Sequence, residues 1–219
     1  MALGAQVRRL FGPVEPIVAE CYRSIFMDMD AFTRQLRRRI TPERVLEVGC
    51  GEGALTTRMA RIWPHARIDG IDLTPRLGRL FSGDRSRVRF QRIPVQEYVA
   101  AEPGVADLVI IGDVMHHIPW EEHPGIFQAS AQALRPGGTL IVKEWIRDGN
   151  PVYWLGYASD RYVSGERIRY GTRDEWLAAF RREFGPTALQ GEFSIAPWSC
   201  NQAFVLSPES SRLEPRRPV

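Results

Sequence analysis

Three glycines and a later acid form the first group of residues whose types and spacing could bind a ligand. Gly49, Gly51 and Gly53 follow the apolar run Val45–Val48 and precede a helical pattern. Glycine permits a sharp turn and a close approach to the backbone, and the start of a helix presents free N–H groups. Asp72 ends the next apolar run, where a carboxylate can bind both hydroxyls of a ribose. The pair predicts a ribose-containing ligand, although a tight turn and a helix cap also explain each feature separately.

Two consecutive histidines form a second group that could do chemistry. His116 and His117 follow the apolar run Asp107–Ile111, and a histidine there could take a proton from a phenol, hydroxyl or amine. Consecutive side chains point in different directions, so we expect at most one to face a reaction centre. A structural role, bonding the backbone of the next loop, stays open for both. No metal cluster is expected around this pair, and His123, in a charged loop, is expected to be solvated.

The elements that position these residues alternate between strand and helix patterns. Apolar runs predict strands at Val45–Val48, Ala66–Ile71, Val88–Arg92, Asp107–Ile111 and Thr139–Trp145. Helices are expected at 17–40, Leu55–Ile62, Ile126–Leu134 and Asp174–Arg182, the last capped by Thr172 or Asp174. Two final strands, about 187–195 and 202–206, are joined by a short turn and should be antiparallel. We expect an α/β fold with a Rossmann-like, doubly wound, mostly parallel seven-stranded sheet and an antiparallel last strand.

Two further stretches are more specific than the glycine loop. Residues 107–119 read DLVIIGDVMHHIP, and residues 134–140 read LRPGGTL. Together with Glu47, the three glycines and Asp72, they resemble the class I S-adenosylmethionine-dependent methyltransferases over residues 42–145. The resemblance implies S-adenosylmethionine as cofactor and transfer of its methyl group to an acceptor.

The resemblance also implies which residues hold the cofactor. The glycine loop would pass beneath the methionine part, Glu47 would approach its amino group, and Asp113 would lie near the sulfonium. Relatives usually carry an acid at the adenine; here Pro94 occupies that position, so Val95 is expected to pack on the ring and Gln96 or Glu97 to replace the acid. The full expected set is Glu47, Gly49, Cys50, Gly51, Gly53, Asp72, Leu73, Val95, Gln96 and Asp113.

Aromatic residues concentrate in a segment that breaks the alternation of strands and helices. In this family the chain beyond strand five commonly forms part of the acceptor pocket, so we expect residues 147–172 to be a substrate lid and residues 1–41 an N-terminal helical cap. The expected acceptor contacts are Tyr22, His117, Glu144, Trp145, Tyr153 and Tyr157. Of two neighbours in strand five, Glu144 is expected to face the acceptor and Lys143 a helix on the other side. An ordinary packing cluster is the alternative for each aromatic residue.

Charge and composition test what kind of acceptor is methylated. Arginine supplies 28 of the 29 basic residues, Lys143 is the only lysine, and the net charge is +3. This excess suggests a nucleic-acid partner, but acids accompany arginines that spread from Arg8 to Arg217. We therefore expect a small-molecule acceptor and no nucleic-acid partner. The alternatives are methylation of RNA or protein, and a module that binds the cofactor without catalysis.

Length and cysteine usage describe the organisation of the chain. The 219 residues fit one domain, 1–206, followed by a disordered tail at 207–219. Three widely spaced cysteines give no disulfide framework, and no run approaches the ~18 apolar residues of a membrane span. We expect a cytoplasmic protein without a membrane partner, and the sequence indicates no oligomeric state.

Overall fold

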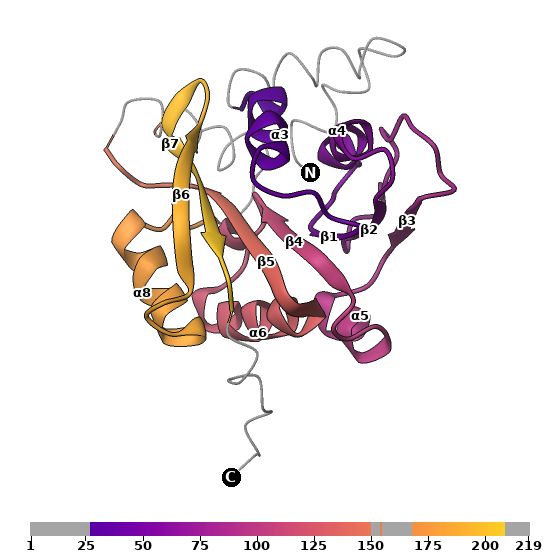
Figure 1. Cartoon of the computed structure of the whole chain (residues 1–219). Helices are drawn as coiled ribbons and strands as arrows, with labels where there is room; N and C mark the ends of the chain where they lie inside the picture. The colour runs from indigo at the N-terminus through magenta and orange to yellow at the C-terminus, as the bar shows by residue number, and fades with distance from the viewer. Residues whose placement is uncertain (1–26, 150–153, 155–167, 209–219) are drawn as a thin grey trace.

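A seven-stranded sheet forms the centre of the computed structural model, which describes residues 27–149, 154 and 168–208 (Figure 1). The strands are β1 (Arg44–Val48), β2 (Arg67–Ile71), β3 (Val88–Gln91), β4 (Ala106–Gly112), β5 (Leu134–Trp145), β6 (Leu189–Ile195) and β7 (Trp198–Leu206). Their order in the sheet is β3-β2-β1-β4-β5-β7-β6. The first five pair in parallel, whereas β7 is antiparallel to both β5 and β6. The predicted fold class is confirmed.

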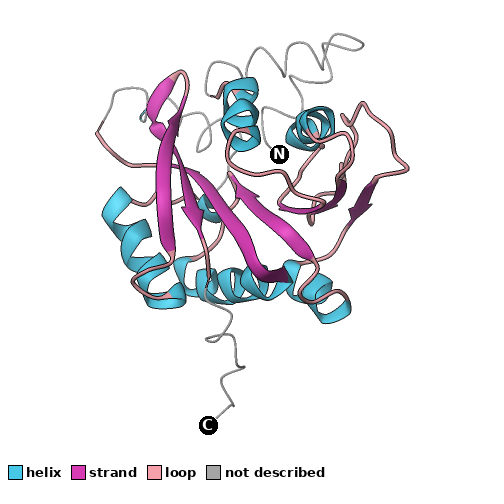
Figure 2. Ribbon diagram, viewed as in Figure 1, coloured by secondary structure: helices cyan, strands magenta, loops and turns pink. Residues whose placement is uncertain are grey.

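Helices cover both faces of this sheet (Figure 2). They are α3 (Met29–Arg37) and α4 (Ala54–Ile62) on one face, and α5 (Val95–Ala101), α6 (His123–Ala133) and α8 (Arg173–Phe184) on the other. The short 3₁₀ turns η2 (Met115–His117) and η3 (Trp120–Glu122) connect β4 to α6. No helix among these described residues has the length and apolar composition that crossing a membrane requires.

Alternation along the strands divides the core into two clusters. In β4, Leu108 and Ile110 pack with α3 and α4, whereas Val109 and Ile111 pack with α6 and α8. All four are fully buried, because a parallel sheet with helices on both sides leaves neither face to water. This two-sided burial is why the strand reads as a continuous apolar run.

Several predicted boundaries are wrong by a few residues, and each shift has a local cause. The helix expected over 17–40 does not continue through Asp28, whose extended backbone and side-chain bond to the Ala31 N–H make it the N-cap of α3. Helix α5 was not predicted because it has only seven residues. Strand β5 begins at Leu134 rather than at the expected Thr139, and a register shift between Ala106 and Leu108 of β4 accommodates the additional residues. Thr172 caps α8 with a complete capping box, as predicted.

The strand order also locates the place where a ligand should bind. The order of the strands changes direction between β1 and β4. Strands β2 and β3 follow on one side of β1, whereas β4 and β5 lie on its other side. In open parallel sheets, ligands bind in the crevice outside the carboxyl ends of the strands at such a point. The glycine loop follows β1 and Asp113 follows β4, so both lie at this crevice.

Candidate functional site

The glycine loop adopts a left-handed backbone at three positions. Gly49, Gly51 and Gly53 have φ angles of +78°, +51° and +86°, which side chains of L-residues rarely allow. A Cβ at Gly49 would lie 1.9 Å from Cγ2 of Val114, whereas a Cβ at Gly51 would meet no atom within 4 Å. Gly49 is therefore required by packing, and the space above Gly51 is open to a ligand.

Asp72 links the end of β2 to this loop. Its Oδ2 accepts a hydrogen bond from the Gly51 N–H at 2.9 Å, and its Oδ1 accepts one from the Thr74 N–H at 2.7 Å. A carboxylate has about four acceptor positions, so both oxygens can still bind hydroxyls. The next residue, Leu73, exposes 62% of its surface, which is unusual for a large apolar side chain. A polar anchor and an apolar surface thus lie side by side.

Glu47 is a buried carboxyl group beneath the loop. It is 3% exposed, and the Thr56 hydroxyl donates to its Oε2 at 2.5 Å. Burial raises the pKa of Glu47 to about 8, although the Thr56 hydrogen bond acts in the opposite direction. An ammonium group placed beside Glu47 would favour its ionised form, so the position suits a cationic amine.

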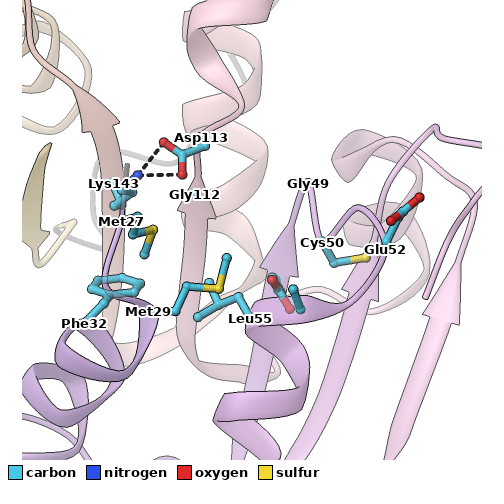
Figure 3. Close-up of a pocket in the computed structure, with 12 residues that line it drawn as sticks. Met27, Met29, Phe32, Gly49, Cys50, Glu52, Leu55, Gly112, Asp113 and Lys143 are labelled. Carbon is cyan, nitrogen blue, oxygen red and sulfur yellow. Dashed lines mark hydrogen bonds and ion pairs between the residues drawn. The ribbon is translucent and has the colours of Figure 1, made fainter. Parts of the chain in front are cut away.

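A cavity of about 290 Å³ lies beside the first part of the glycine loop and Glu47 (Figure 3). The glycine loop forms one wall, and Asp113 and Lys143 close the far side. Apolar residues of α3, together with Met27 just before this helix, form a further part of the wall. The lining residues are Met27, Met29, Phe32, Glu47, Gly49, Cys50, Glu52, Ala54, Leu55, Gly112, Asp113 and Lys143. Of the expected cofactor residues, Glu47, Gly49, Cys50 and Asp113 therefore meet at one cavity, whereas Gly51, Gly53, Asp72 and Leu73 are not among the described residues that line it.

Lys143 and Asp113 form an ion pair at this cavity. The Lys143 ammonium lies 2.5 Å from both carboxylate oxygens of Asp113, and the two side chains are 1% and 41% exposed. Asp113 has a φ of +55°, and its N–H donates to the Lys143 carbonyl at 3.0 Å. Aspartate tolerates this left-handed conformation better than most residues. The turn after β4 thereby directs the carboxylate back onto β5.

The predicted orientations of Lys143 and Glu144 are reversed in the structure. Ile141 packs on the α3 side and Val142 on the α6 side, so alternation places Lys143 on the cavity side and Glu144 opposite. Glu144 is fully buried, and Gly112, the register partner of Lys143, has no side chain to occupy the cavity. The expected acceptor contact through Glu144 is wrong, because its carboxylate is enclosed away from the cavity.

Glu144 instead holds the turn that contains the histidine pair. Its Oε1 accepts from the Val114 and Met115 N–H groups at 3.0 and 2.7 Å, and its Oε2 lies 2.6 Å from Nδ1 of His116. Burial acts to raise the pKa of Glu144, but a protonated His116 ring, the His116 hydrogen bond, the Lys143 ammonium and the Met115 N–H together hold the pKa below its ordinary value. Glu144 is thus an ionised, buried group that orients His116.

The two histidines differ in exposure. His116 is 5% exposed, with its ring 4.8 Å from that of Tyr170, whereas His117 is exposed. Neither is among the described residues that line the cavity. Contrary to the expectation of no cluster, ligand atoms of Asp113, His116 and Glu144 lie within 4.8 Å of one another. Bonds within the protein already engage them, since Lys143 pairs with Asp113 and three donors surround Glu144.

His123 is buried rather than solvated. It begins α6, is 1% exposed, and stacks on Trp176 with ring centres 5.5 Å apart. Its Nε2 lies 2.9 Å from the Met115 carbonyl and 3.1 Å from the Ile118 carbonyl, so Nε2 carries the proton. Burial lowers the pKa of His123, although these two carbonyls oppose the shift. This histidine fixes the connection from β4 to α6.

The remaining expected site residues fall into two groups. Val95 is buried in the core at the start of α5, Gln96 lies beside α6 near Gly125, and Trp145 packs against Tyr170 in a small cluster. None of these three is among the described residues that line the cavity. The second group, Tyr22, Tyr153 and Tyr157, lies outside the described residues. Val95 is buried because it begins the short helix α5, whose first turn directs its side chain into the core.

Comparisons with known proteins concern the same region of the chain. A family model for a methyltransferase domain matches residues 45–138. The chain is 39% identical over 103 residues to a ubiquinone biosynthesis O-methyltransferase of Xanthomonas campestris pv. campestris (strain B100), a match covering 45% of this chain and 41% of that protein. It is 32% identical over 162 residues to the protein of the same name from Ralstonia nicotianae, covering 68% of this chain and 66% of the relative.

Solved structures share the fold. The apo form of the S-adenosylmethionine-dependent methyltransferase SibL superposes with a TM-score of 0.68 at 19% identity, over 83% of this chain and 55% of that one. The chain spans 41% of the length of the Xanthomonas relative and 66% of the Ralstonia relative. The matched region contains the glycine loop, Asp72, the turn after β4 and the start of β5. The chain belongs to the class I S-adenosylmethionine-dependent methyltransferases.

Proposed function

We propose that this chain transfers a methyl group from S-adenosylmethionine to an oxygen atom of a small-molecule acceptor. The observation that carries the proposal is the open space above Gly51, with Asp72 at one end and the buried Glu47 beneath it. A bound cofactor supplies a methyl group on a positively charged sulfur. The oxygen acceptor is supported by relatives named O-methyltransferases.

The chain's own groups fit the cofactor in charge and polarity. In this proposal Glu47 binds the amino group of the methionine part, because a buried carboxyl group gains most from a cationic partner. Asp72 binds the ribose hydroxyls through the acceptor positions that its two backbone bonds leave. Leu73 offers its exposed side chain to the adenine, and Asp113 faces the sulfonium side of the cavity.

The acceptor side of the proposal rests on the apolar wall. Met27, Met29 and Phe32 line the cavity, and flexible methionines with an aromatic ring suit a hydrophobic or planar molecule. Under the proposal the cap at 1–41 and the lid at 147–172 belong to one domain, 1–206, although most of both segments lies outside the described residues. The packing of α3 against α4 beside the cavity supports the role of the cap.

Proton removal from the acceptor is assigned to His116. Glu144 bonds Nδ1 and stabilises the positive ring that forms when Nε2 takes a proton, which is how a carboxylate assists a histidine base. Most of the rate is attributed to alignment, because methyl transfer is an in-line displacement that needs donor and acceptor held in contact without water. His117, exposed on the same turn, is the second candidate base.

Calorimetry with S-adenosylhomocysteine, the demethylated cofactor, tests the proposal. We expect micromolar binding to the wild-type chain and at least tenfold weaker binding to Gly51→Val. Gly191→Val is the control, since a Cβ at Gly191 also meets nothing within 4 Å but lies on β6, far along the sheet. Absence of binding to S-adenosylhomocysteine and S-adenosylmethionine alike in the folded wild type would refute the proposed function. A labelled methyl donor added to extracts would then identify the compound that gains the methyl group.

A further inference from the structure

The only lysine of the chain is buried at the wall of the cavity. Its side chain is 1% exposed, and among the described residues Nζ is hydrogen-bonded only to the two oxygens of Asp113. An ammonium group has three N–H donors, so one donor of Lys143 has no acceptor among the residues that the structure describes. A buried donor without an acceptor costs about 1–3 kcal/mol, more when it is charged. Such a group is a reason to look for a ligand oxygen.

The position of Lys143 across the sheet identifies the ligand. The proposed cofactor contacts run from Asp72 after β2, through the glycine loop after β1, to Asp113 after β4. Lys143 lies on β5, the next strand in that direction, and pairs in register with Gly112. It therefore stands beyond the sulfonium end of the proposed cofactor, on the side from which an acceptor must approach.

Charge balance favours an anionic oxygen at this place. A sulfonium and the Lys143 ammonium carry two positive charges, and Asp113 supplies one negative charge. An ionised acceptor oxygen would give the Lys143 ammonium an anionic partner in a cavity whose wall includes Met27, Met29 and Phe32. A neutral amine acceptor has no negative charge to place beside it.

We infer that Lys143 binds the reacting oxygen of the acceptor as an anion, so that the acceptor is a compound with an acidic hydroxyl group such as a phenol. This inference rests on the proposed function. The hydroxyl proton goes to His116, an electron pair of the oxygen forms the O–CH₃ bond, and the electron pair of the broken S–CH₃ bond stays on sulfur. Lys143 keeps all three protons, and Asp113 keeps Lys143 charged and in place.

Binding of a chromogenic phenol to the complex with S-adenosylhomocysteine tests the inference without turnover. The probes are 4-nitrophenol and its neutral amine counterpart, 4-nitroaniline. We expect wild type to bind 4-nitrophenol at least tenfold more tightly than 4-nitroaniline and to shift its ionisation to lower pH, seen in the phenolate absorbance. Lys143→Met should abolish the preference and the shift, and Lys143→Arg should restore part of both. Arg61→Met, which removes an exposed cation from the last turn of α4, should change neither.

The outcomes separate this inference from the proposed function. If S-adenosylhomocysteine does not bind at all, the proposed function fails. If it binds, and wild type does not prefer the phenol or Lys143→Met keeps the preference, the role of Lys143 is overturned while the proposed function stands. Melting temperature and S-adenosylhomocysteine affinity monitor folding. Should Lys143→Met fail to fold, Asp113→Asn replaces it, because an uncharged partner must lower the preference for the phenol if the ion pair holds the ammonium in place.

Discussion

The carboxylate of Asp72 accepts a hydrogen bond from the backbone N–H of Gly51 at 2.9 Å, across 21 residues of sequence. The acid after β2 and the loop after β1 are thus one unit, because parallel pairing of these strands brings their carboxyl ends together. Asp72 shapes the loop in this arrangement, and under the proposed function its remaining acceptor positions bind the ligand.

Removing Asp72 should therefore weaken both the loop and the ligand complex. We expect Asp72→Ala to reduce S-adenosylhomocysteine affinity more than tenfold, about 1.4 kcal/mol or more, and to lower stability by about 1–3 kcal/mol as two N–H groups lose their acceptor. Calorimetry and thermal unfolding measure the two effects. Asp72→Asn, which keeps one acceptor oxygen, should lose less stability. Unchanged affinity in a folded Asp72→Ala protein would contradict the placement.

Alanine at the two loop glycines should separate stability from binding. Gly49→Ala is expected to destabilise the fold most, because its Cβ would overlap Val114 and its φ is +78°. Gly51→Ala adds only left-handed strain, roughly 1–2 kcal/mol, but its Cβ enters the open space. Denaturant unfolding should rank Gly49→Ala as the less stable variant, and calorimetry should find a clear affinity loss in Gly51→Ala. A lower stability of Gly51→Ala than of Gly49→Ala would show that the Val114 side chain can move away from an added Cβ at little energetic cost.

The sequence predicts the sheet well because buried parallel strands have a simple signature. Leu108 to Ile111 are all fully buried, so the run of apolar residues identifies β4 without knowledge of its neighbours. Burial on both faces also removes the alternation that would show to which face each side chain points. Nothing in the apolar run of β5 therefore shows that Lys143 faces the cavity and Glu144 the opposite side. That assignment depends on which helices cover which face, and it is set by tertiary packing.

His123 shows a second limit of local reasoning. Its sequence neighbours Glu121 and Glu122 indicate a solvated loop, yet Trp176 of α8 stacks on the ring from far along the chain. The short helix α5 was missed for a related reason, since seven residues give too little periodicity to detect. The glycine loop follows β1 and Asp72 follows β2 as expected, because both placements depend only on strands that the apolar runs identify. The binding roles of these residues stay predictions.

Glu47 should couple cofactor binding to proton release. Its pKa of about 8 in the folded chain lies above the ordinary value of 4.5, so it is largely protonated at pH 7. A cationic amine favours the ionised form, and binding should release up to one proton at pH 7, fewer above pH 8. Calorimetry in two buffers of different ionisation enthalpy measures that proton. Glu47→Gln should abolish the buffer dependence, and equal enthalpies in both buffers for wild type would contradict the assignment.

The same shift predicts the pH dependence of stability. Below pH 4.5 the carboxyl group is protonated in both folded and unfolded chains and contributes nothing. Between about 4.5 and 8 the unfolded chain ionises Glu47 and the folded chain does not, so wild type loses stability as pH rises, by a few kcal/mol in total. Glu47→Gln lacks this loss, so its stability relative to wild type should increase from pH 5 to pH 8 in urea unfolding. A constant difference would mean that the carboxyl group is ionised in the folded chain.

The histidine pair provides the test of general base catalysis. His116 is buried and bonded to Glu144, whereas His117 is exposed on the same turn, so the two form a matched pair. We expect His116→Ala to lower kcat by about 10²–10⁴ at saturating cofactor, and His117→Ala to lower it by less than about threefold. S-adenosylhomocysteine affinity should stay within a few-fold in both. Glu144→Gln keeps an acceptor oxygen for the turn but removes the negative charge, so it should lower kcat in the same direction as His116→Ala. If neither histidine variant affects kcat, alignment of donor and acceptor suffices, and the His116–Glu144 pair serves to hold the turn after β4.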